Sequence, residues 1–243
     1  MSFYNVVSAS DESTVITEYK PSAKRSDSYQ SEADLEREFI RLLGEQSYEY
    51  LNIKSEEDLI KNLRKKLEQL NNYEFTDGEW KRFFNECMAN PNEGIVEKTR
   101  KIQEDNVQNL KTDAGFTKNI TLIDKKNIHN NRLQVINQYE ATGNYDNRYD
   151  VTILVNGLPL VHIELKRRGV AIKEAFNQID RYQRDSFWAS CGLYEYVQIF
   201  VISNGTNTKY YSNTTRFNHI KDSASGQAKK KGKTSNSFEF TSF

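Results

Sequence analysis

The sequence predicts an α/β protein with a mixed central β-sheet of about five strands flanked by α-helices. Three observations support this fold class. Two apolar stretches between residues 147 and 168 are separated by Asn156-Gly157, a dipeptide that strongly favours a β-hairpin. Several other segments repeat apolar residues at helical spacing behind capping residues. Residues 196–202 form an almost continuous apolar run, which is typical of a buried strand.

Composition limits the classes of partner and compartment. The 243 residues include 34 Lys and Arg and 34 Asp and Glu, so the formal net charge is zero. Any binding of a polyanion must therefore come from local basic patches rather than from the field of the whole molecule. Cys87 and Cys191 are too few for a disulfide framework and lack metal-ligand spacing. Because no apolar run suits a membrane span and no signal peptide is evident, we expect a cytoplasmic protein without a membrane partner.

The amino-terminal third is expected to be helical after a loose start. Residues 1–27 are polar and Ser-rich, with a weak strand candidate at residues 14–19, so a loose or edge segment is predicted. Ser31 and Asp34 form a capping box that opens a helix, and Gly44 is expected to end it. The apolar stripe of this helix is formed by Leu35, Phe39 and Leu42.

Further helices are predicted over residues 55–70, from the capping box that begins at Thr76, over residues 95–102 and over residues 171–184. The helices between about residues 55 and 105 form an elaboration that packs against the sheet. Besides the hairpin, strands are predicted at residues 120–123 and 133–139, and residues 208–211 are expected to return as an edge strand. Residues 216–243 are rich in Ser, Gly and Lys, a composition that predicts a flexible linker.

The hairpin pattern also determines which side chains share a face. Apolar residues alternate on both strands: Val151, Ile153 and Val155 on the first, and Val161, Ile163 and Leu165 on the second. A slip by one residue would pair these positions with polar ones, so paired residue numbers must have an even sum. A loop of residues 156–158 places Asp150 opposite Glu164. Lys166 then lies on the same face, roughly 6–7 Å further along the strand.

This combination of residues suits phosphodiester hydrolysis. Two neighbouring carboxylates repel each other unless a proton or a cation lies between them. Mg²⁺ prefers oxygen ligands, so Asp150 and Glu164 are candidate ligands, and the backbone carbonyl of Leu165 is a further one. Lys166 could position the attacking water or offset charge on the phosphate. The alternative is a structural hairpin with a solvated polar face, but Glu164 lies in an apolar run where an unpaired charge is costly.

These residues resemble the PD-(D/E)xK nuclease motif. The chain is similar to the amino-terminal nuclease domain of the R (HsdR) subunit of type I restriction enzymes. Four segments carry the resemblance: RYDVTILVNGLPLVHIELKRRGVAIKEAFNQIDRY from Arg148, SYQSEADLEREFI from Ser28, LIDKKN from Leu122 and FVISNGTNTKYYSNTT from Phe200. The resemblance implies an endonuclease domain over residues 28–215 with a PD-(D/E)xK restriction-endonuclease-like core. Asp150, Glu164 and Lys166 match the catalytic positions, whereas Tyr149 stands where the generic motif has Pro.

Further roles are implied by the same resemblance. Related nucleases have a helical Glu beside the metal, which favours Glu32, with Glu36 as the fallback; Glu32 could instead be a first-turn acid favoured by the helix dipole. Gln178 and Tyr182 match a Q-x-x-x-Y motif that supports the site or contacts the DNA strand, although spacing alone also fits an exposed pair.

The loop that carries Lys125 and Lys126 corresponds to a family loop between nuclease and motor. These lysines could couple the two, or they could be ordinary solvated charges.

The resemblance also implies partners. The family cuts double-stranded DNA in a complex in which the S subunit recognises the target, the M subunit methylates it and an ATP-driven motor translocates DNA. No G-x-x-x-x-G-K-[ST] phosphate loop occurs in the chain, so ATP would bind only through a motor that this chain lacks, and we expect the chain to be a fragment. Two alternatives are another PD-(D/E)xK nuclease, such as a repair or junction-resolving enzyme, and a non-catalytic module that binds DNA or a protein partner.

Overall fold

The structure is a computed structural model that describes residues 4–9, 15–19, 31–142, 146–187, 191–213 and 241–242. The chain divides into two compact units, Met1–Gln30 and Ser31–Phe243. In the first unit, β1 (Tyr4–Ala9) pairs antiparallel with β2 (Val15–Tyr19). β2 matches the strand expected at residues 14–19, but the sequence analysis missed its partner β1. The linker predicted for residues 216–243 lies outside the described residues, apart from the short strand β11.

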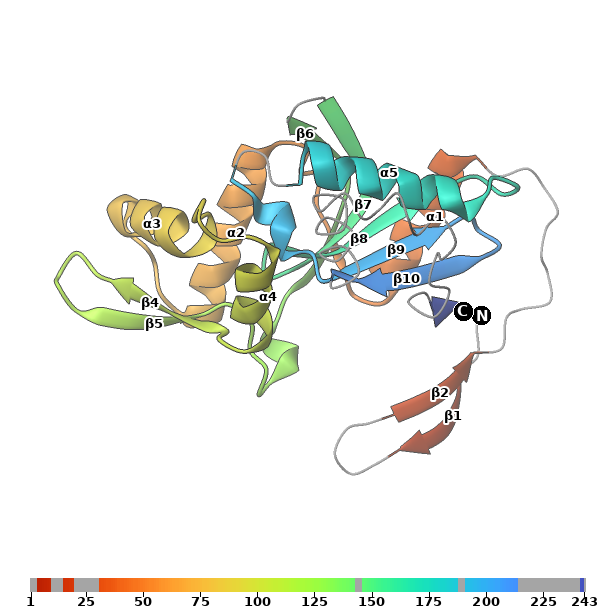
Figure 1. The fold of residues 1–243 in the computed structure, drawn as a ribbon. Coiled ribbons are helices and arrows are strands. Elements are labelled where there is room, and N and C mark those ends of the chain that lie inside the picture. Colours follow the sequence, from red (N-terminus) through yellow and green to blue (C-terminus); the bar gives the residue numbers. More distant parts are fainter. Residues whose placement is uncertain are drawn as a thin grey trace. The chain divides into compact units, whose positions relative to one another are not determined.

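A mixed seven-stranded sheet forms the centre of the second unit, in the order β11-β10-β9-β8-β7-β6-β3 (Figure 1). Its strands are β3 (Glu49–Tyr50), β6 (Leu133–Thr142), β7 (Asp146–Val155), β8 (Leu158–Leu165), β9 (Ile199–Ser203), β10 (Thr208–Ser212) and β11 (Thr241–Ser242). The β3–β6 and β8–β9 pairs are parallel and the others are antiparallel. The predicted α/β class with a central hairpin is therefore confirmed. β10, which was expected at an edge, instead pairs with β11.

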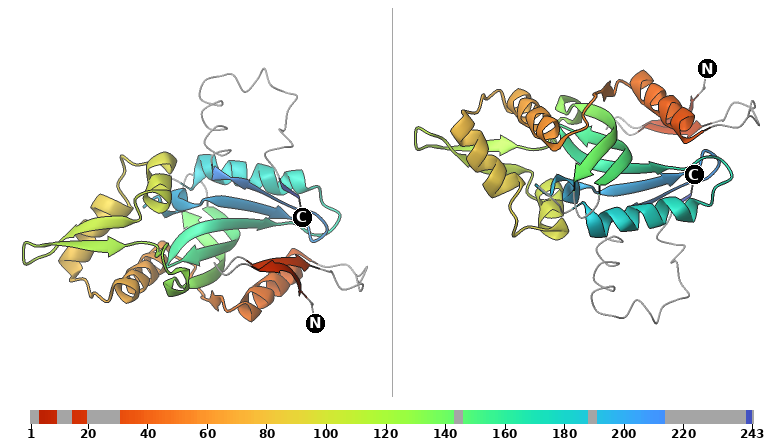
Figure 2. Two further views of the ribbon diagram at one scale, coloured as in Figure 1. Left: turned by 90° about the horizontal axis from the view of Figure 1, so that it is seen from below. Right: turned by 90° about the horizontal axis from the view of Figure 1, so that it is seen from above.

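Two helices cover opposite faces of this sheet, as Figure 2 shows: α1 (Glu32–Glu45) lies on one side and α5 (Ile172–Asp185) on the other. Ser31 and Asp34 form the predicted capping box of α1. The helix packs on Val151, Ile163 and Leu165, the apolar face of the hairpin. Leu43, and not the predicted Leu42, is the buried leucine near the end of α1, and Leu42 is 39% exposed. The helix ends at Glu45, one residue after the predicted Gly44.

The helical elaboration is present and includes a small sheet that the sequence analysis did not predict. Its elements are α2 (Glu56–Asn71), α3 (Asp77–Phe83) with a π-helical extension (Phe84–Met88), α4 (Ile95–Gln103), β4 (Val107–Lys111) and β5 (Thr117–Thr121). The strand expected at residues 120–123 overlaps the end of β5 at residues 120–121, and β5 pairs with β4 and not with the central sheet. The pattern of apolar residues predicted a strand there but did not identify its partner, because strand partners are set by tertiary packing.

The apolar run at residues 196–202 is also divided between two elements. A 3₁₀ helix, Leu193–Tyr196, precedes β9, and Ile199 at the start of β9 is 41% exposed. A second 3₁₀ helix, Ile128–Asn130, lies between β5 and β6. The strand is therefore shorter than the apolar run, because the run begins in the 3₁₀ helix at Tyr196 and reaches β9 only at Ile199.

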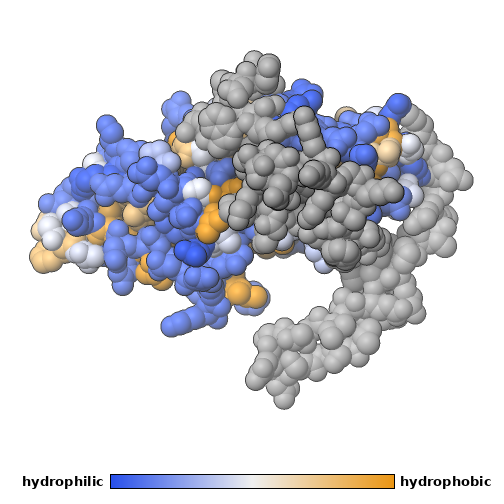
Figure 3. Space-filling model, in the orientation of Figure 1, coloured by the Kyte–Doolittle hydropathy of each residue, from blue (hydrophilic) through white to orange (hydrophobic). Residues whose placement is uncertain are grey.

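The visible surface in Figure 3 is mainly hydrophilic where it is not drawn in grey, with several small apolar patches, one of them at the end of the β4–β5 hairpin. Phe116, in the turn of that hairpin, is 73% exposed. Among the helices described, none combines the length and the apolar character that a bilayer-spanning helix requires.

The β7–β8 turn differs from the predicted loop but gives the predicted register further along. Asn156 and Gly157 both have positive φ, 51° and 84°, so the turn contains two residues instead of three. A bulge at Leu160 then inserts the extra residue, and beyond it Val151 lies opposite Ile163, as expected. The loop length was wrong, whereas the pairing near the candidate acids was right.

Gly157 is required for a second reason. A Cβ atom at this position would lie 2.6 Å from the Cα of Leu63 in α2. The turn and the helix can therefore approach this closely only if the turn residue has no side chain.

We predict that Gly157→Ala lowers the free energy of unfolding by about 3 kcal/mol, since the alanine adds backbone strain at positive φ to a clash with helix backbone. Chemical denaturation followed by circular dichroism measures the change. Gly115→Ala is the matched control, because Gly115 also has positive φ (85°) but has open space around it, and it should lose only about 1 kcal/mol. Equal losses in the two variants would contradict the close-packing explanation.

Candidate functional site

Asp150 and Glu164 lie where β7 and β8 separate. The backbone pairing of the two strands is regular at Val151 and Ile163, and just beyond it Asp150 Oδ2 accepts a hydrogen bond from the backbone N–H of Leu165, 2.9 Å away. β8 continues alongside β9, where Lys166 N donates to Ser203 O at 2.8 Å. The Asp150 carboxylate therefore provides the acceptor that a backbone carbonyl of a paired strand would otherwise offer to Leu165 N.

The third predicted residue, Lys166, reaches the same point. Its Nζ lies 3.4 Å from Glu164 Oε1 and 3.0 Å from the carbonyl oxygen of Leu165. Glu164 is fully buried and Lys166 is 9% exposed. The ammonium thus contacts two of the oxygen atoms that were predicted as metal ligands, and it offsets negative charge in a site with little access to water.

Burial shifts the protonation of both acids. It raises the pKa of Asp150 to about 7, with a further upward contribution from the Glu164 carboxylate, while the hydrogen bond from Leu165 opposes the shift. Burial also raises the pKa of Glu164 to about 7, and the Lys166 ammonium acts in the opposite direction. Because each carboxylate raises the energy of ionising the other, the pair retains a proton near neutral pH unless a cation compensates it.

The buried side chains behind Glu164 were not predicted from the sequence. His162 is fully buried, and its Nε2 lies 3.4 Å from Glu164 Oε2. Aromatic rings surround the imidazole: Tyr149, Tyr182, Phe187, Tyr194 and Phe200. The face opposite α1 is therefore an aromatic core and not a wet surface. The period of two along β8 could have identified His162, since it lies two residues before Glu164 and points the same way.

Gln178 and Tyr182 connect α5 to the strand that carries Asp150. Gln178 Nε2 donates to Tyr182 OH, which in turn donates to the carbonyl oxygen of Arg148 at 2.9 Å. Tyr182 is 1% exposed. The pair therefore holds the helix to β7 two residues before Asp150, which is a supporting position and not a direct contact with the acids.

The two glutamates of α1 have different surroundings. Glu32 is exposed, and its Oε1 accepts a hydrogen bond from Arg167 N at 3.3 Å; its charge also contributes to the raised pKa of Glu164. Glu36 is buried and accepts hydrogen bonds from the side-chain amides of Asn137 and Gln138 in β6. Glu32 is therefore the α1 acid on the side of the carboxyl pair, and Glu36 is engaged elsewhere.

Lys125 and Lys126 lie away from these residues. Lys125 Nζ donates to the carbonyl oxygen of Gln103, and both lysines are exposed. Their loop is attached to the β7–β8 turn, where Asn156 Nδ2 donates to Asn131 Oδ1 at 2.8 Å. The turn is five residues of strand from Asp150, or about 17 Å.

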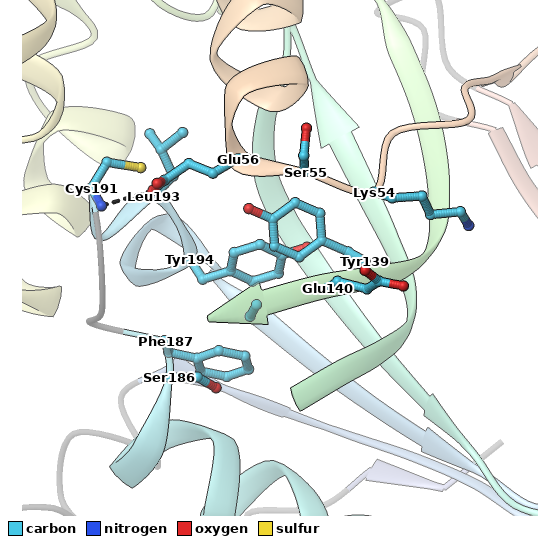
Figure 4. Close-up of a pocket in the computed structure, with 11 residues that line it drawn as sticks. Lys54, Ser55, Glu56, Tyr139, Glu140, Ser186, Phe187, Cys191, Leu193 and Tyr194 are labelled. Carbon is cyan, nitrogen blue, oxygen red and sulfur yellow. Dashed lines mark hydrogen bonds between the residues drawn. The ribbon is translucent and has the colours of Figure 1, made fainter. Parts of the chain in front are cut away.

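A cavity of about 210 Å³ lies beside the site and is shown in Figure 4. Tyr139, Phe187 and Tyr194 form its aromatic lining, with Glu56 and Glu140 among its polar residues. The Tyr139 ring stacks on Tyr149 at 5.9 Å between centroids, which connects the cavity wall to the aromatic core behind Glu164. Asp150, Glu164 and Lys166 are not among its lining residues.

The donor set fits a hard divalent cation held by few protein ligands. Within the described part of the chain, no group of three or more His, Cys, Asp or Glu side chains is arranged to hold a metal. Asp150, Glu164 and the carbonyl of Leu165 nevertheless offer oxygen donors, and Glu164 Oε2 is buried without a hydrogen-bond partner among these residues. One or two carboxylates completed by water and substrate oxygens are typical of Mg²⁺ sites. The arrangement therefore offers oxygen donors of the kind that a hard divalent cation prefers.

Comparison with known proteins agrees with this chemistry. Residues 29–219 match the family described as type I restriction enzyme R protein N terminus. The chain is 52% identical over 211 residues to the type I restriction enzyme EcoprrI endonuclease subunit of Escherichia coli, an alignment that covers 86% of this chain and 67% of the relative. It is 41% identical over 190 residues to the SsaAORF53P endonuclease subunit of Staphylococcus saprophyticus, covering 76% of this chain and 20% of the relative.

A more distant relative is the putative MjaIXP endonuclease subunit of Methanocaldococcus jannaschii, which is 36% identical over 105 residues, or 41% of this chain and 10% of the relative. The chain thus spans a fifth or less of the length of the staphylococcal and methanogen relatives. The family model covers most of the residues described above, including the β7–β8 fork and both flanking helices. The chain belongs to the type I restriction enzyme R protein N-terminal family, whose curated relatives are endonuclease subunits.

Proposed function

We propose that residues 28–215 form the endonuclease domain of a type I restriction enzyme R subunit, with residues 55–105 as a helical elaboration and residues 216–243 as a linker. The domain would hydrolyse phosphodiester bonds of double-stranded DNA with Mg²⁺ as cofactor. The observation that carries the proposal is the convergence of Asp150, Glu164 and Lys166 at the fork between β7 and β8, because a partly buried and a fully buried carboxyl group beside one ammonium require a compensating cation or a proton.

In this proposal, Asp150 and Glu164 hold the cation, together with the carbonyl of Leu165 and, on the α1 side, Glu32. When bound, a divalent cation stabilises the charge that develops on phosphorus and lowers the pKa of a coordinated water. Lys166 Nζ would move away from Leu165 O. It would then either position the attacking water or neutralise charge on a phosphate oxygen. Gln178 and Tyr182 would keep β7, and with it Asp150, in place.

The complete activity would need other components. By analogy with type I restriction enzymes, an ATP-driven motor would translocate DNA to this domain, and the M subunit would methylate DNA. By the same analogy, target recognition would belong to the S subunit. ATP would act only through the motor.

Asp150→Ala, Glu164→Ala and Lys166→Ala should each reduce DNA cleavage by the reconstituted complex at least 100-fold, on the order of the loss expected when one charge-stabilising group is removed. Cleavage is measured on a supercoiled plasmid with ATP and Mg²⁺ present. Circular dichroism should show a folded chain, and ATP hydrolysis should continue. Glu45→Ala, on the exposed last turn of α1, is the control that should cut normally. Wild-type cleavage by any of the first three variants would refute the assigned roles.

A second prediction concerns pH in the absence of divalent cations. The folded-state pKa values of Asp150 and Glu164, about 7, exceed those of the unfolded chain, about 4, so the folded state binds more protons between these values. The wild-type chain should therefore lose stability as pH rises from 4 to above 7.

Glu164→Gln should diminish that loss, by on the order of 1–3 kcal/mol between pH 5 and pH 8. Urea unfolding of both proteins in EDTA at the two pH values measures the difference. The same pH dependence in variant and wild type would show that the carboxyl pair is not destabilised by ionisation.

The third prediction tests Lys125 and Lys126. If their loop couples the nuclease to the motor, the double variant Lys125→Ala/Lys126→Ala should alter cleavage relative to ATP hydrolysis by about threefold or more while its thermal unfolding stays unchanged, because both side chains are exposed. Parallel cleavage and ATPase assays on the reconstituted complex provide the ratio. An unchanged ratio would dismiss a coupling role for the two lysines.

A further inference from the structure

The strand beside Asp150 contains a residue in an unfavourable backbone conformation. Gln138 of β6 has φ of +51°, in the left-handed region that residues with a side chain rarely adopt. It stands directly across from Asp150, because the pairs on either side are Asn137 with Val151 and Tyr139 with Tyr149. The register is the same before and after Gln138, so no residue has been inserted and the distortion is local.

The side chain of Glu36 holds this distorted segment from α1. Its carboxylate accepts one hydrogen bond from Asn137 Nδ2 and another from Gln138 Nε2. Glu36 is 8% exposed, so these contacts form with little competition from water. A buried carboxylate that binds two consecutive side chains can fix the backbone between them.

Lys54 holds the same segment from the other edge. Next to β6, the chain pairs normally at Leu51, whose N–H donates to Val135 O at 3.0 Å, and again at Glu140, whose N–H donates to Lys54 O at 3.0 Å. Between these points, Lys54 Nζ donates to the carbonyl oxygen of Asn137. The ammonium therefore takes the place of a missing strand partner. Figure 4 shows the Lys54 side chain leading away from the rings of Tyr139 and Tyr194.

Asp150 depends on this arrangement because its own strand contacts are reduced. Toward β8, regular pairing reaches only Val151 and Ile163, and the Asp150 carboxylate itself binds Leu165 N. Toward β6, it faces Gln138. If Gln138 returned to an extended conformation, the peptide groups opposite Asp150 would turn and the backbone of β7 would have to adjust to them.

We propose that Glu36 and Lys54 are positioning residues that hold Gln138 left-handed and thereby set Asp150 for metal binding. This inference rests on the proposed function and adds a supporting role that is distinct from ligation. It also gives Glu36 a place in the site without a direct contact to the metal.

A second polar cluster on the same strand is a natural control. Lys66 Nζ contacts Glu49 Oε2 at 2.9 Å, and Gln134 Nε2 of β6 donates to the same carboxylate at 3.0 Å. Lys66 is as buried as Glu36, each being 8% exposed. Gln134, however, pairs regularly with Leu154, away from the carboxyl pair. Loss of Lys66 should therefore affect stability alone.

The test measures binding of Mn²⁺ to the 243-residue chain by isothermal titration calorimetry, with thermal unfolding of each variant recorded in EDTA. Glu36→Ala and Lys54→Met should each weaken Mn²⁺ binding about tenfold. Lys66→Met should bind Mn²⁺ with the affinity of the wild type. Its unfolding temperature should be lowered at least as much as those of Glu36→Ala and Lys54→Met. Should Glu36→Ala fail to fold, Glu36→Gln serves in its place, since it removes one of the two acceptor oxygens.

The signs of these effects separate positioning from simple electrostatics. A purely coulombic influence would weaken Mn²⁺ binding when the negative Glu36 is removed and strengthen it when the positive Lys54 is removed. Positioning predicts weakening in both. Glycine adopts left-handed φ without a steric penalty, so Gln138→Gly added to Lys54→Met should recover part of the lost affinity.

Asp150→Asn tests whether the Mn²⁺ that calorimetry detects binds at Asp150. If the wild type binds Mn²⁺ and Asp150→Asn does not, while Glu36→Ala and Lys54→Met bind normally, the positioning role is refuted and the proposed function stands. Tighter binding by Lys54→Met would also refute positioning. If Asp150→Asn binds as the wild type does, or if the wild type binds no Mn²⁺, the metal site itself is wrong and the positioning role falls with it.

Discussion

The pairing of β7 with β8 is the constraint on which the candidate site depends. Gly157 lets the turn approach α2, and the bulge at Leu160 restores the register that brings Val151 opposite Ile163. One residue of slip in either direction would turn Asp150 and Glu164 to opposite faces of the sheet. The acids therefore meet because of packing some 17 Å away, at the other end of the hairpin.

The same packing opposes the ionisation of the acids that it brings together. Glu164 is enclosed by His162 and a group of aromatic rings, and burial is the largest cause of its raised pKa. Lys166 offsets part of this cost, because its ammonium lies beside Glu164 Oε1. A site of this kind is least stable when it is ionised and lacks a cation, so the affinity for a divalent ion that we propose would come partly from relief of that repulsion.

Much of this could be predicted from the sequence, because periodicity and capping are local signals. Spacing and residue type were enough to predict the capping boxes at Ser31 and Thr76 and the pairing of Val151 with Ile163. The sequence did not reveal the bulge at Leu160, since a two-residue turn with a bulge and a three-residue loop give the same register. It also left open that residues 117–121 would pair with a strand in the helical elaboration, because strand partners are chosen by tertiary packing. The φ of Gln138 is likewise set by Glu36 and Lys54, which are distant in sequence.

The site is also the part of the sheet where the β7–β8 backbone pairing ends and the β6–β7 pairing is interrupted at Gln138, and side chains satisfy backbone groups there. Asp150 accepts from the amide of Leu165, Lys54 donates to the carbonyl of Asn137, and Tyr182 donates to the carbonyl of Arg148. Buried backbone groups must be satisfied, so each interruption of the ladder requires a polar side chain nearby. A fork in the sheet therefore concentrates carboxylates, amines and hydroxyls at one place. Three of the side chains gathered there are well suited to bind a cation and a phosphate, which explains why the interruption and the candidate chemistry coincide.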